Sequence, residues 1–387
     1  MREPAAEARA RTAVSGPEPA SASPVPACVG PTPASACPTS AGGPAPASVR
    51  PGPDAPLAPA ARLDPAARPY LDALAAGFPD LGGRVTDADE ARRILAAAPR
   101  PAAARPRVGA VEDRSVPGPP GAPPVPVRVY LPDPERWPGP RPTVVFSHGG
   151  GWVLGDLDTH DTTARNISRA AGAAVVSVDY RRAPEHRFPA ALEDVHAVLC
   201  WAGAHLDELG GAPEALVVAG DSSGGNLAAA SLLLSRERGG PAVALQVLVY
   251  PALDAAQDSA SYRADAEGCF LTAAHMRWFW AQYLGPDGRP DDPLASPVRA
   301  DPAGLPPAHV VVAGCDPLRD EGVAYHRRLN ETGITSVLDV RPGLFHGFLA
   351  LAGVLPVARA VLDGLGGAIR STLSNGKTSG EAGGDAG

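Results

Sequence analysis

The sequence predicts an α/β fold in which a mostly parallel central sheet is flanked by helices on both faces. Short runs rich in β-branched residues recur along the chain, and stretches with helical periodicity separate most of them. One run ends in a Gly-rich turn that leads into a Leu/Ala-rich stretch, which is typical of a strand, a sharp turn and a helix. Ligand sites in such sheets lie at the carboxyl ends of strands, so functional residues are expected there.

The predicted strands are short runs in which apolar residues alternate or follow one another. They cover residues 125–129, 143–146, 174–178, 216–219, 245–250, 310–313 and 337–340. Between them lie helical stretches such as 190–205, where Leu192, Val195 and Leu199 share one face. This alternation is the pattern of parallel strands connected by helices.

Length and composition favour one large domain. The 387 residues, 44% of them hydrophobic, can form a substantial core. The net charge of −8 argues against a nucleic-acid partner, because phosphate binding needs clustered Lys and Arg. No run of about 18 apolar residues occurs, so no membrane span is expected.

Cysteine spacing bears on the redox state of the chain. The five cysteines show neither the C-x-x-C spacing of a metal site nor an even disulfide framework. They are Cys28, Cys37, Cys200, Cys269 and Cys315. A reduced, cytoplasmic protein without metal is therefore expected.

The two ends of the chain differ in composition from its middle. Residues 1–60 are rich in Pro, Ala, Ser and Gly and are expected to be a disordered leader, because they have too few large apolar side chains to form a core. Residues 375–387 are a Gly-rich polar tail with the same expectation, which leaves 61–374 as the catalytic domain. Two short helices predicted within 63–99 must dock on that domain, either as a lid over the site or against the back of the sheet.

The Gly-rich turn holds the candidate nucleophile. Gly220, Ser222 and Gly224 fit the pattern G-x-S-x-G, in which a serine projects from a strained turn at the end of a strand. Small residues at both offsets avoid a collision across so tight a turn. Short matches of this kind also arise by chance in loops without chemistry, but the strand–turn–helix context favours Ser222 as a nucleophile.

A serine nucleophile needs a base to take its proton and an acid to orient that base. Of the nine histidines, His346 is placed at the carboxyl end of a strand after Ser222, following a predicted loop at 341–345. Asp316 follows the 310–313 strand and is the candidate acid, although an Asp before Pro is also a common helix cap. Asp320 and Glu321 are expected to be solvated or paired with Arg. The order Ser222, Asp316, His346 is that of α/β-hydrolases.

Acyl transfer also requires donors for the oxyanion that forms during the reaction. The segment His148-Gly149-Gly150-Gly151-Trp152 follows a predicted strand and matches the glycine loop whose backbone N–H groups form such a hole, together with the N–H of the residue after the nucleophile. A phosphate-binding P-loop is the rival interpretation, but no Lys follows the glycines.

Taken together, the motifs resemble those of the hormone-sensitive-lipase-like (type IV) esterase family of α/β-hydrolases. They are HGGGW at 148–152, DYRRAPEHRFPAALEDV at 179–195, GDSSGGN at 220–226, DPLRDEG at 316–322 and HGF at 346–348. The resemblance covers about residues 63–372. It implies a carboxylic-ester hydrolase with Ser222, Asp316 and His346 as the triad, with Gly150, Gly151 and Ser223 as oxyanion donors and Gly149 as a helper.

The same resemblance implies a helical cap formed by residues 63–100 and 254–291, no cofactor, and small to medium acyl esters as substrates. By analogy, a homodimer through an edge strand is also expected. The 179–194 block is expected to be structural, with Arg181, Glu185 and Asp194 pairing internally and His186 playing no catalytic part. Two alternatives stay open: an N-acyl amide hydrolase or acyltransferase with the same triad, and a non-catalytic ligand receptor, which the presence of His346 disfavours.

Overall fold

An eight-stranded sheet forms the centre of the computed structural model, which describes residues 63–98 and 105–380. The strand order is β1-β2-β4-β3-β5-β6-β7-β8. Strand β2 runs antiparallel to both of its neighbours, and all other pairs are parallel. The fold is therefore the mostly parallel α/β architecture that the sequence predicts.

Each predicted strand is present in the structure. The strands are β1 (Ala110–Val116), β2 (Val125–Leu131), β3 (Arg141–Ser147), β4 (Ala174–Val178), β5 (Gly211–Asp221), β6 (Leu245–Val249), β7 (Ala308–Cys315) and β8 (Ser336–Phe345). Strand β1 was not predicted, because its charged, largely exposed sequence lacks apolar alternation. The loop predicted at 341–345 is wrong, since β8 continues to Phe345.

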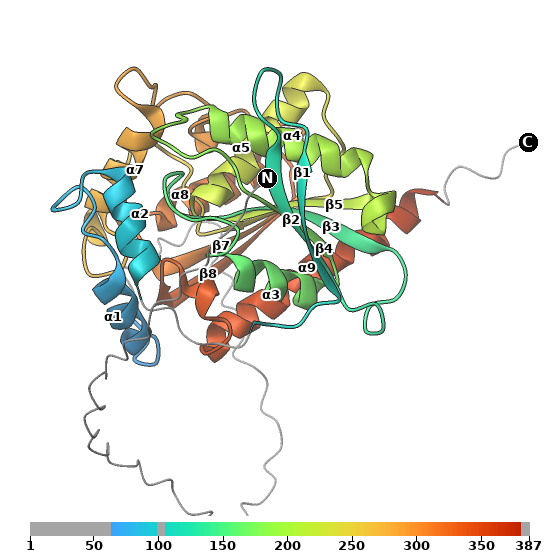
Figure 1. Cartoon of the computed structure of the whole chain (residues 1–387), viewed down its shortest axis with the longest axis horizontal. Coiled ribbons are helices and arrows are strands. Elements are labelled where there is room, and N and C mark those ends of the chain that lie inside the picture. The colour runs from blue at the N-terminus through green and yellow to red at the C-terminus, as the bar shows by residue number, and fades with distance from the viewer. Residues whose placement is uncertain (1–62, 99–104, 381–387) are drawn as a thin grey trace, which may run out of the picture. The chain divides into compact units, whose positions relative to one another are not determined.

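Two helical layers cover the sheet (Figure 1). Helices α3 (Asp161–Ala171) and α9 (Pro356–Gly380) pack together on one face. The other face is covered by α4 (Ala190–Ala204), α5 (Ser223–Arg238) and α8 (Arg319–Glu331). Successive side chains of a strand lie on opposite faces of the sheet. Val144 therefore belongs to the core under α3 and α9, and Val145 to the core under α4 and α5.

The structure describes only part of the two terminal segments. Helix α9 ends at Gly380 and thus extends into the tail segment predicted for residues 375–387. The remaining tail and the predicted leader lie outside the described residues. None of the described helices has the length and apolar character needed to cross a membrane.

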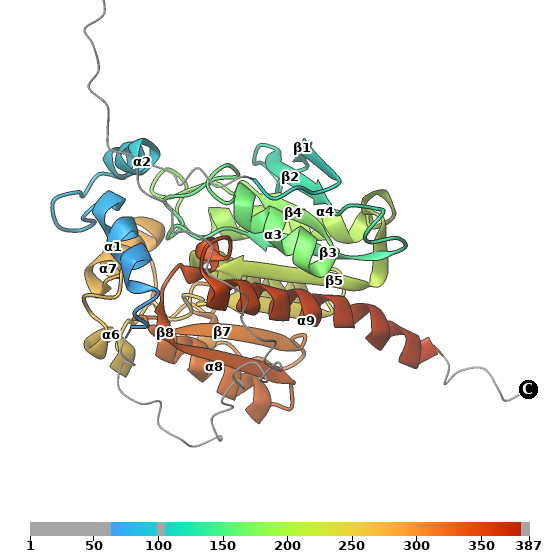
Figure 2. The same ribbon diagram turned by 90° about the horizontal axis from the view of Figure 1, so that it is seen from below.

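Four short helices gather at one side of the sheet: α1 (Arg68–Gly77), α2 (Ala88–Ala97), α6 (Ala260–Ala264) and α7 (Ala273–Leu284). Figure 2 shows them on the side toward which the arrowhead of β5 points. The indole N–H of Trp278 in α7 donates to the carbonyl of Thr86, 3.0 Å away, just before α2. The ring of Phe78, which follows α1, lies 5.1 Å from that of Phe270. Segments far apart in sequence thus meet at the carboxyl ends of the strands.

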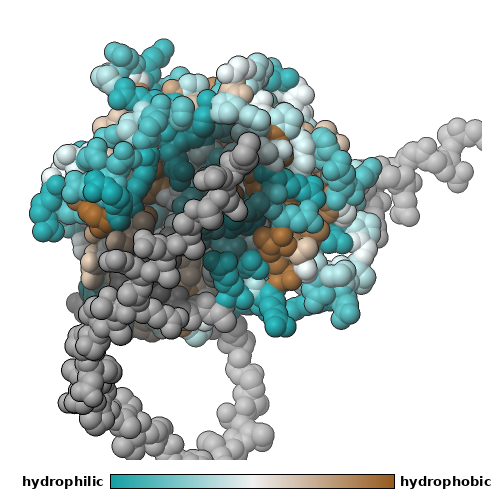
Figure 3. Space-filling view, in the orientation of Figure 1, coloured by the Kyte–Doolittle hydropathy of each residue, from teal (hydrophilic) through white to brown (hydrophobic). Residues whose placement is uncertain are grey.

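Hydrophilic side chains cover most of the described surface in the view of Figure 3, and the hydrophobic areas there are small and separate. The exposed large aliphatic side chains include Val111 on edge strand β1 and Val337 on edge strand β8. Most of the apolar side chains are thus in the two cores rather than on this face.

Candidate active site

Ser222 lies at the sharp turn between the central strand β5 and helix α5. Its backbone has φ 56° and ψ −122°, a conformation that is strained for a residue with a side chain. The turn needs glycine next to it, because a Cβ on Gly224 would lie 1.9 Å from the carbonyl oxygen of Ser147. The N–H of Ser222 donates to the Val249 carbonyl at 2.9 Å, which fixes the turn to β6.

A hydrogen-bonded row joins Ser222, His346 and Asp316. The Oγ of Ser222 lies 2.9 Å from Nε2 of His346, and Nδ1 of His346 lies 2.8 Å from Oδ2 of Asp316. All three side chains are buried, and Asp316 is inaccessible to solvent. The other carboxylate oxygen of Asp316 accepts the Leu318 N–H at 2.9 Å.

Strand register explains why the acid and the imidazole meet. Cys315 and Phe345 are directly opposite each other in the parallel pair β7–β8. The next residues, Asp316 and His346, therefore leave the sheet side by side. The ring of Tyr250, from the end of β6, packs on the imidazole with 4.6 Å between ring centroids.

The glycine loop follows β3 at the same level as the Ser222 turn, since Ser147 pairs with Gly220. Gly150 and Gly151 have φ values of 119° and 61°, which favour glycine. Within the described part of the chain, the N–H groups of Gly150, Gly151 and Ser223 donate to no protein acceptor. These three groups therefore have no partner among the described residues that would compete with a ligand oxygen.

Gly149 differs from the other two glycines. Its N–H donates to Oδ1 of Asp221 at 3.0 Å, so this donor is already engaged. In this structure the Gly149 N–H thus binds a protein acceptor, which ties the loop to the end of β5.

Helix α7 packs against the glycine loop. A Cβ on Gly151 would lie 2.1 Å from the ring of Phe279, so the ring contacts the loop backbone directly. The next residue, Trp152, is fully buried and stacks on Tyr283 with 4.3 Å between ring centroids and an interplanar angle of 2°. These contacts fix the position of the loop beside Ser222.

Comparison with known proteins agrees with this geometry. A family model described as the α/β-hydrolase fold matches residues 144–350. Over 271 residues the chain is 44% identical to the carboxylic ester hydrolase LipN of Mycobacterium tuberculosis, a match that covers 68% of this chain and 71% of that protein. The chain belongs to the α/β-hydrolase family. The motif resemblance to its hormone-sensitive-lipase-like branch is confirmed.

Other members of the α/β-hydrolase family are also similar. The ethyl acetate hydrolase of Pseudomonas putida is 37% identical over 238 residues, which cover 60% of this chain and 74% of that protein. The solved structure of a hyperthermophilic esterase from Pyrobaculum calidifontis is 36% identical and has a TM-score of 0.71, covering 81% of this chain and 99% of that one.

Behind the glycine loop of this α/β-hydrolase lies a buried polar layer that the sequence did not reveal. Asp221 accepts the Gly149 N–H and lies 3.8 Å from Nε2 of His160. Burial alone would raise the pKa of Asp221, but His160 and the Gly149 N–H lower it below its ordinary value. The Tyr180 hydroxyl donates to the His148 carbonyl at 2.8 Å, and its ring stacks on that of His148. The only local signal for Asp221 was its place directly before the nucleophile.

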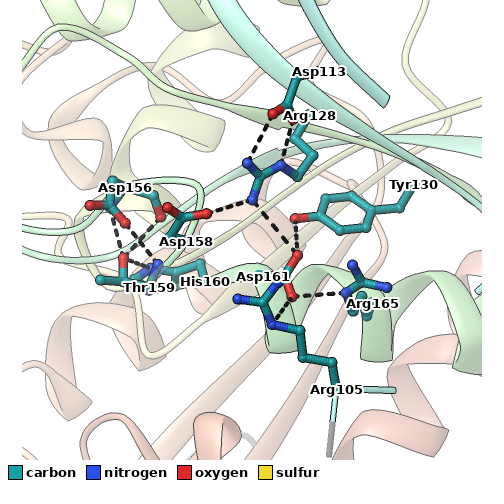
Figure 4. Close-up of polar contacts among 10 residues, drawn as sticks. All are labelled: Arg105, Asp113, Arg128, Tyr130, Asp156, Asp158, Thr159, His160, Asp161 and Arg165. Atoms are coloured by element: carbon teal, nitrogen blue, oxygen red, sulfur yellow. Dashed lines mark hydrogen bonds and ion pairs between the residues drawn. The ribbon is translucent and has the colours of Figure 1, made fainter. Parts of the chain in front are cut away.

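His160 belongs to the segment 156–161, which leads into α3 and is fixed by several polar contacts (Figure 4). Thr159 Oγ1 lies 3.1 Å from Nδ1 of His160 and accepts the Asp156 N–H. At the end of the segment, Oδ1 of Asp161 accepts the Tyr130 hydroxyl at 3.0 Å, and Arg128 pairs with Asp158 at 2.8 Å. Strand β2 thereby anchors the segment that carries His160.

The pairing expected within the 179–194 block is present only in part. Arg181 binds Asp194 through Nη2 and Oδ1, 2.8 Å apart. Glu185, which was expected to pair within the block, instead pairs with Arg92 of α2 at 2.7 Å, and this guanidinium lowers the pKa of Glu185 to about 2. His186 takes no part in the hydrogen bonds that join Ser222, His346 and Asp316.

Glu321 was expected to be solvated or paired with Arg, and this is wrong. It is buried, and its Oε2 accepts the N–H groups of Leu253 and Asp254. Burial raises its pKa well above the ordinary value for a glutamate. Asp320 does pair with an arginine, because its Oδ1 lies 2.9 Å from Nε of Arg319.

The expectation of fully reduced cysteines is also wrong. Cys269 and Cys315 form a disulfide across 46 residues, and Cys200 is free. Spacing gave no signal for this pair because the two residues meet only in the folded chain. The cysteine argument for a cytoplasmic protein therefore no longer holds. Asp265 lies beside the sulfurs, but it pairs with Arg319 and the sulfurs are joined, so this group does not fit a cation.

Proposed function

We propose that this chain is a serine carboxylic-ester hydrolase that acts on short to medium acyl esters through an acyl-enzyme intermediate. The observation that carries the proposal is the row of Ser222, His346 and Asp316 beside free backbone donors. The names of its relatives, carboxylic ester hydrolase and ethyl acetate hydrolase, support the same reaction class.

In the acylation step, Nε2 of His346 takes the proton of Ser222, and Oγ attacks the ester carbonyl carbon. The second ring nitrogen of His346 donates to Asp316, which selects the tautomer with a free Nε2 and stabilises the imidazolium that forms. The imidazolium then gives its proton to the leaving alcohol, and the acyl group stays on Ser222.

Deacylation repeats these steps with water. His346 removes a proton from a water molecule, the hydroxyl attacks the acyl carbon, and the proton returns to Ser222 as the acid leaves. In both steps the oxyanion is bound by the N–H groups of Gly150, Gly151 and Ser223. Each such donor contributes about 10²- to 10³-fold in rate. The proposed chemistry uses side chains and backbone groups of the protein.

Substrate length is proposed to be limited by a cap made of the described parts of the 63–100 and 254–291 segments. Phe279 of α7 lies against Gly151, so the helix approaches the point at which the acyl group would be bound. Buried aromatic side chains fill α7, including Trp278, Phe279 and Trp280. A closely packed cap of this kind favours small acyl groups by shape.

The proposal is tested by hydrolysis of p-nitrophenyl esters from acetyl to palmitoyl, with the wild type and Ser222→Ala measured side by side. Activity is expected to peak at short chains and to vanish in the variant. A wild type that hydrolyses none of the esters, while a fluorophosphonate still labels Ser222, would contradict the ester assignment and favour an amide or a specialised acyl acceptor. Loss of labelling as well would favour the receptor alternative.

A homodimer through edge strand β8 is a further part of the proposal. Val337 on this strand is 46% exposed, which is high for a valine in a sheet. Sedimentation should give a dimer whose mass falls to that of one chain when Val337 is replaced by Lys. A wild type that sediments as a single chain would contradict the dimer.

A further inference from the structure

Residues 261–269, which comprise most of α6 and the start of the connection to α7, lie against the loop that carries Asp316. They contact residues 314–320, a stretch that includes the end of β7, the connecting loop and the start of α8. The contacts fall on both sides of Asp316: a disulfide at the residue before it, and an ion pair and hydrogen bonds at the residues after it. Asp316 itself takes no part in these contacts, since its carboxylate binds Leu318 and His346.

The covalent contact is the disulfide between Cys269 and Cys315. The two Cα atoms are 5.4 Å apart, and both residues are buried. Cys315 is the last residue of β7 and directly precedes Asp316. The bond therefore ties the start of the acid's loop to a segment that would otherwise reach it only by packing.

An ion pair and a serine hold the other end of the loop. Nη1 of Arg319 lies 2.9 Å from Oδ2 of Asp265 and donates to the carbonyl of Gly314 at 3.0 Å. Both side chains are buried, so water screens the pair little. Ser261 donates through Oγ to the Pro317 carbonyl at 2.6 Å, and its N–H donates to Asp320 at 2.8 Å.

The same segment also reaches the loop that carries His346. Phe270 follows Cys269 directly, and its ring lies 6.2 Å from that of Phe345 in an edge-on arrangement. A Cβ on Gly347 would lie 3.7 Å from the Phe270 ring. Movement of the segment would thus disturb both residues that flank the imidazole.

We propose that the Cys269–Cys315 disulfide, with the Asp265–Arg319 ion pair, is a clamp that positions Asp316 against His346, and that a dithiol reductant lowers turnover by opening it. This inference rests on the proposed function of Ser222. In the redox step the dithiol is oxidised to its own disulfide while the Cys269–Cys315 bond breaks. Two electrons and two protons pass to the sulfurs, which become two thiols.

The test uses a host in which Cys28, Cys37 and Cys200 are replaced by Ser, so that only the proposed pair remains. Thiol titration of the denatured host is expected to detect thiols only after reduction. Adding Cys269→Ser and Cys315→Ser is expected to lower kcat on p-nitrophenyl acetate about 10- to 100-fold, since a misplacement of about 1 Å can cost about 10²-fold. KM should change less than kcat, because the disulfide joins the loop of Asp316 directly.

Three comparisons separate positioning from a purely structural role. Dithiothreitol is expected to lower kcat in the host and to have no effect in the variant without the pair. The single variant Cys200→Ser, whose cysteine is free and lies in α4, should behave as the wild type. Arg319→Ala is expected to lower kcat in the same way, and Arg319→Lys to restore part of it by keeping the charge beside Asp265.

Several outcomes would overturn the clamp. One is free thiols at both positions in the unreduced host. Another is an unchanged kcat per folded molecule once the bond is removed, with only the melting temperature lowered. If the serine variant fails to fold, the dithiothreitol and Arg319→Lys measurements still decide. Absence of both turnover and fluorophosphonate labelling in the oxidised wild type would instead overturn the proposed function, and the positioning role with it.

Discussion

Asp221 connects the nucleophile's turn to the glycine loop through one hydrogen bond. It directly precedes the nucleophile, and its carboxylate accepts the N–H of Gly149. It thereby links the turn that carries the nucleophile to the loop that carries the oxyanion donors. At the residue scale, the geometry of the site depends on this one buried acceptor.

Replacing Asp221 with Ala is expected to lower kcat about 10- to 100-fold, because the Gly149 N–H loses its acceptor and the neighbouring donors shift. Asp221→Asn keeps an oxygen at the same place and should lose much less. Steady-state kinetics on p-nitrophenyl acetate would measure both. A folded Ala variant with the wild-type kcat would show that the loop is held by other contacts.

Residues that belong to a local sequence motif could be predicted, whereas contacts between distant segments could not. Ser222, His346 and the glycine loop were found because strand ends and glycine spacing are visible in sequence. The partner of the Gly149 N–H could not be predicted, because its acceptor is a side chain from another strand. The partners of Glu185 and Cys269 were missed for the same reason, since both meet their partners only through tertiary packing.

At the scale of elements, helix α7 packs directly against the glycine loop. The ring of Phe279 fills the space that a side chain at position 151 would need. Gly151 also has a positive φ of 61°. The helix and the loop can therefore approach each other only if this residue is glycine.

Gly151→Ala is accordingly expected to lower kcat by about 10²- to 10³-fold, the effect of losing one oxyanion donor. Gly353→Ala is the matched control, because a Cβ there meets no atom within 4 Å. It should leave the ester hydrolysis rate unchanged. Similar rates for Gly151→Ala and Gly353→Ala would contradict the assigned role of the loop.

At the scale of the whole molecule, the sheet and its two cores are what the sequence predicts best. The alternation that sends Val144 to one helical layer and Val145 to the other is visible in the apolar runs. Burial in the folded molecule also lowers the pKa of a histidine. The pKa of His148, fully buried beneath the glycine loop, is lowered to about 3, chiefly by burial and further by His160 and Arg182, although Gly149 and Asp221 oppose this.

This shift predicts how stability depends on pH. An unfolded chain protonates His148 near its ordinary pKa of about 6.5, whereas the folded chain excludes the proton down to about pH 3. The unfolded state thus binds more protons in this window, so stability falls as the pH is lowered from about 6.5 toward 3. One proton contributes a slope of about 1.4 kcal/mol per pH unit.

Urea unfolding of the wild type and His148→Asn at several pH values between 4 and 7 would measure this contribution. The variant is expected to show a shallower loss of unfolding free energy with falling pH, whatever its stability at neutral pH. Parallel curves for the two proteins would show that His148 does not titrate in this way.

The measurement that bears most directly on the proposed acyl-enzyme chemistry is the mass of the intact protein after reaction with a fluorophosphonate. One adduct per chain is expected, on the peptide that contains Ser222. Ser222→Ala should carry none, and His346→Ala should react far more slowly because Nε2 no longer takes the Ser222 proton. Undiminished labelling of Ser222→Ala would place the nucleophile elsewhere and contradict the mechanism.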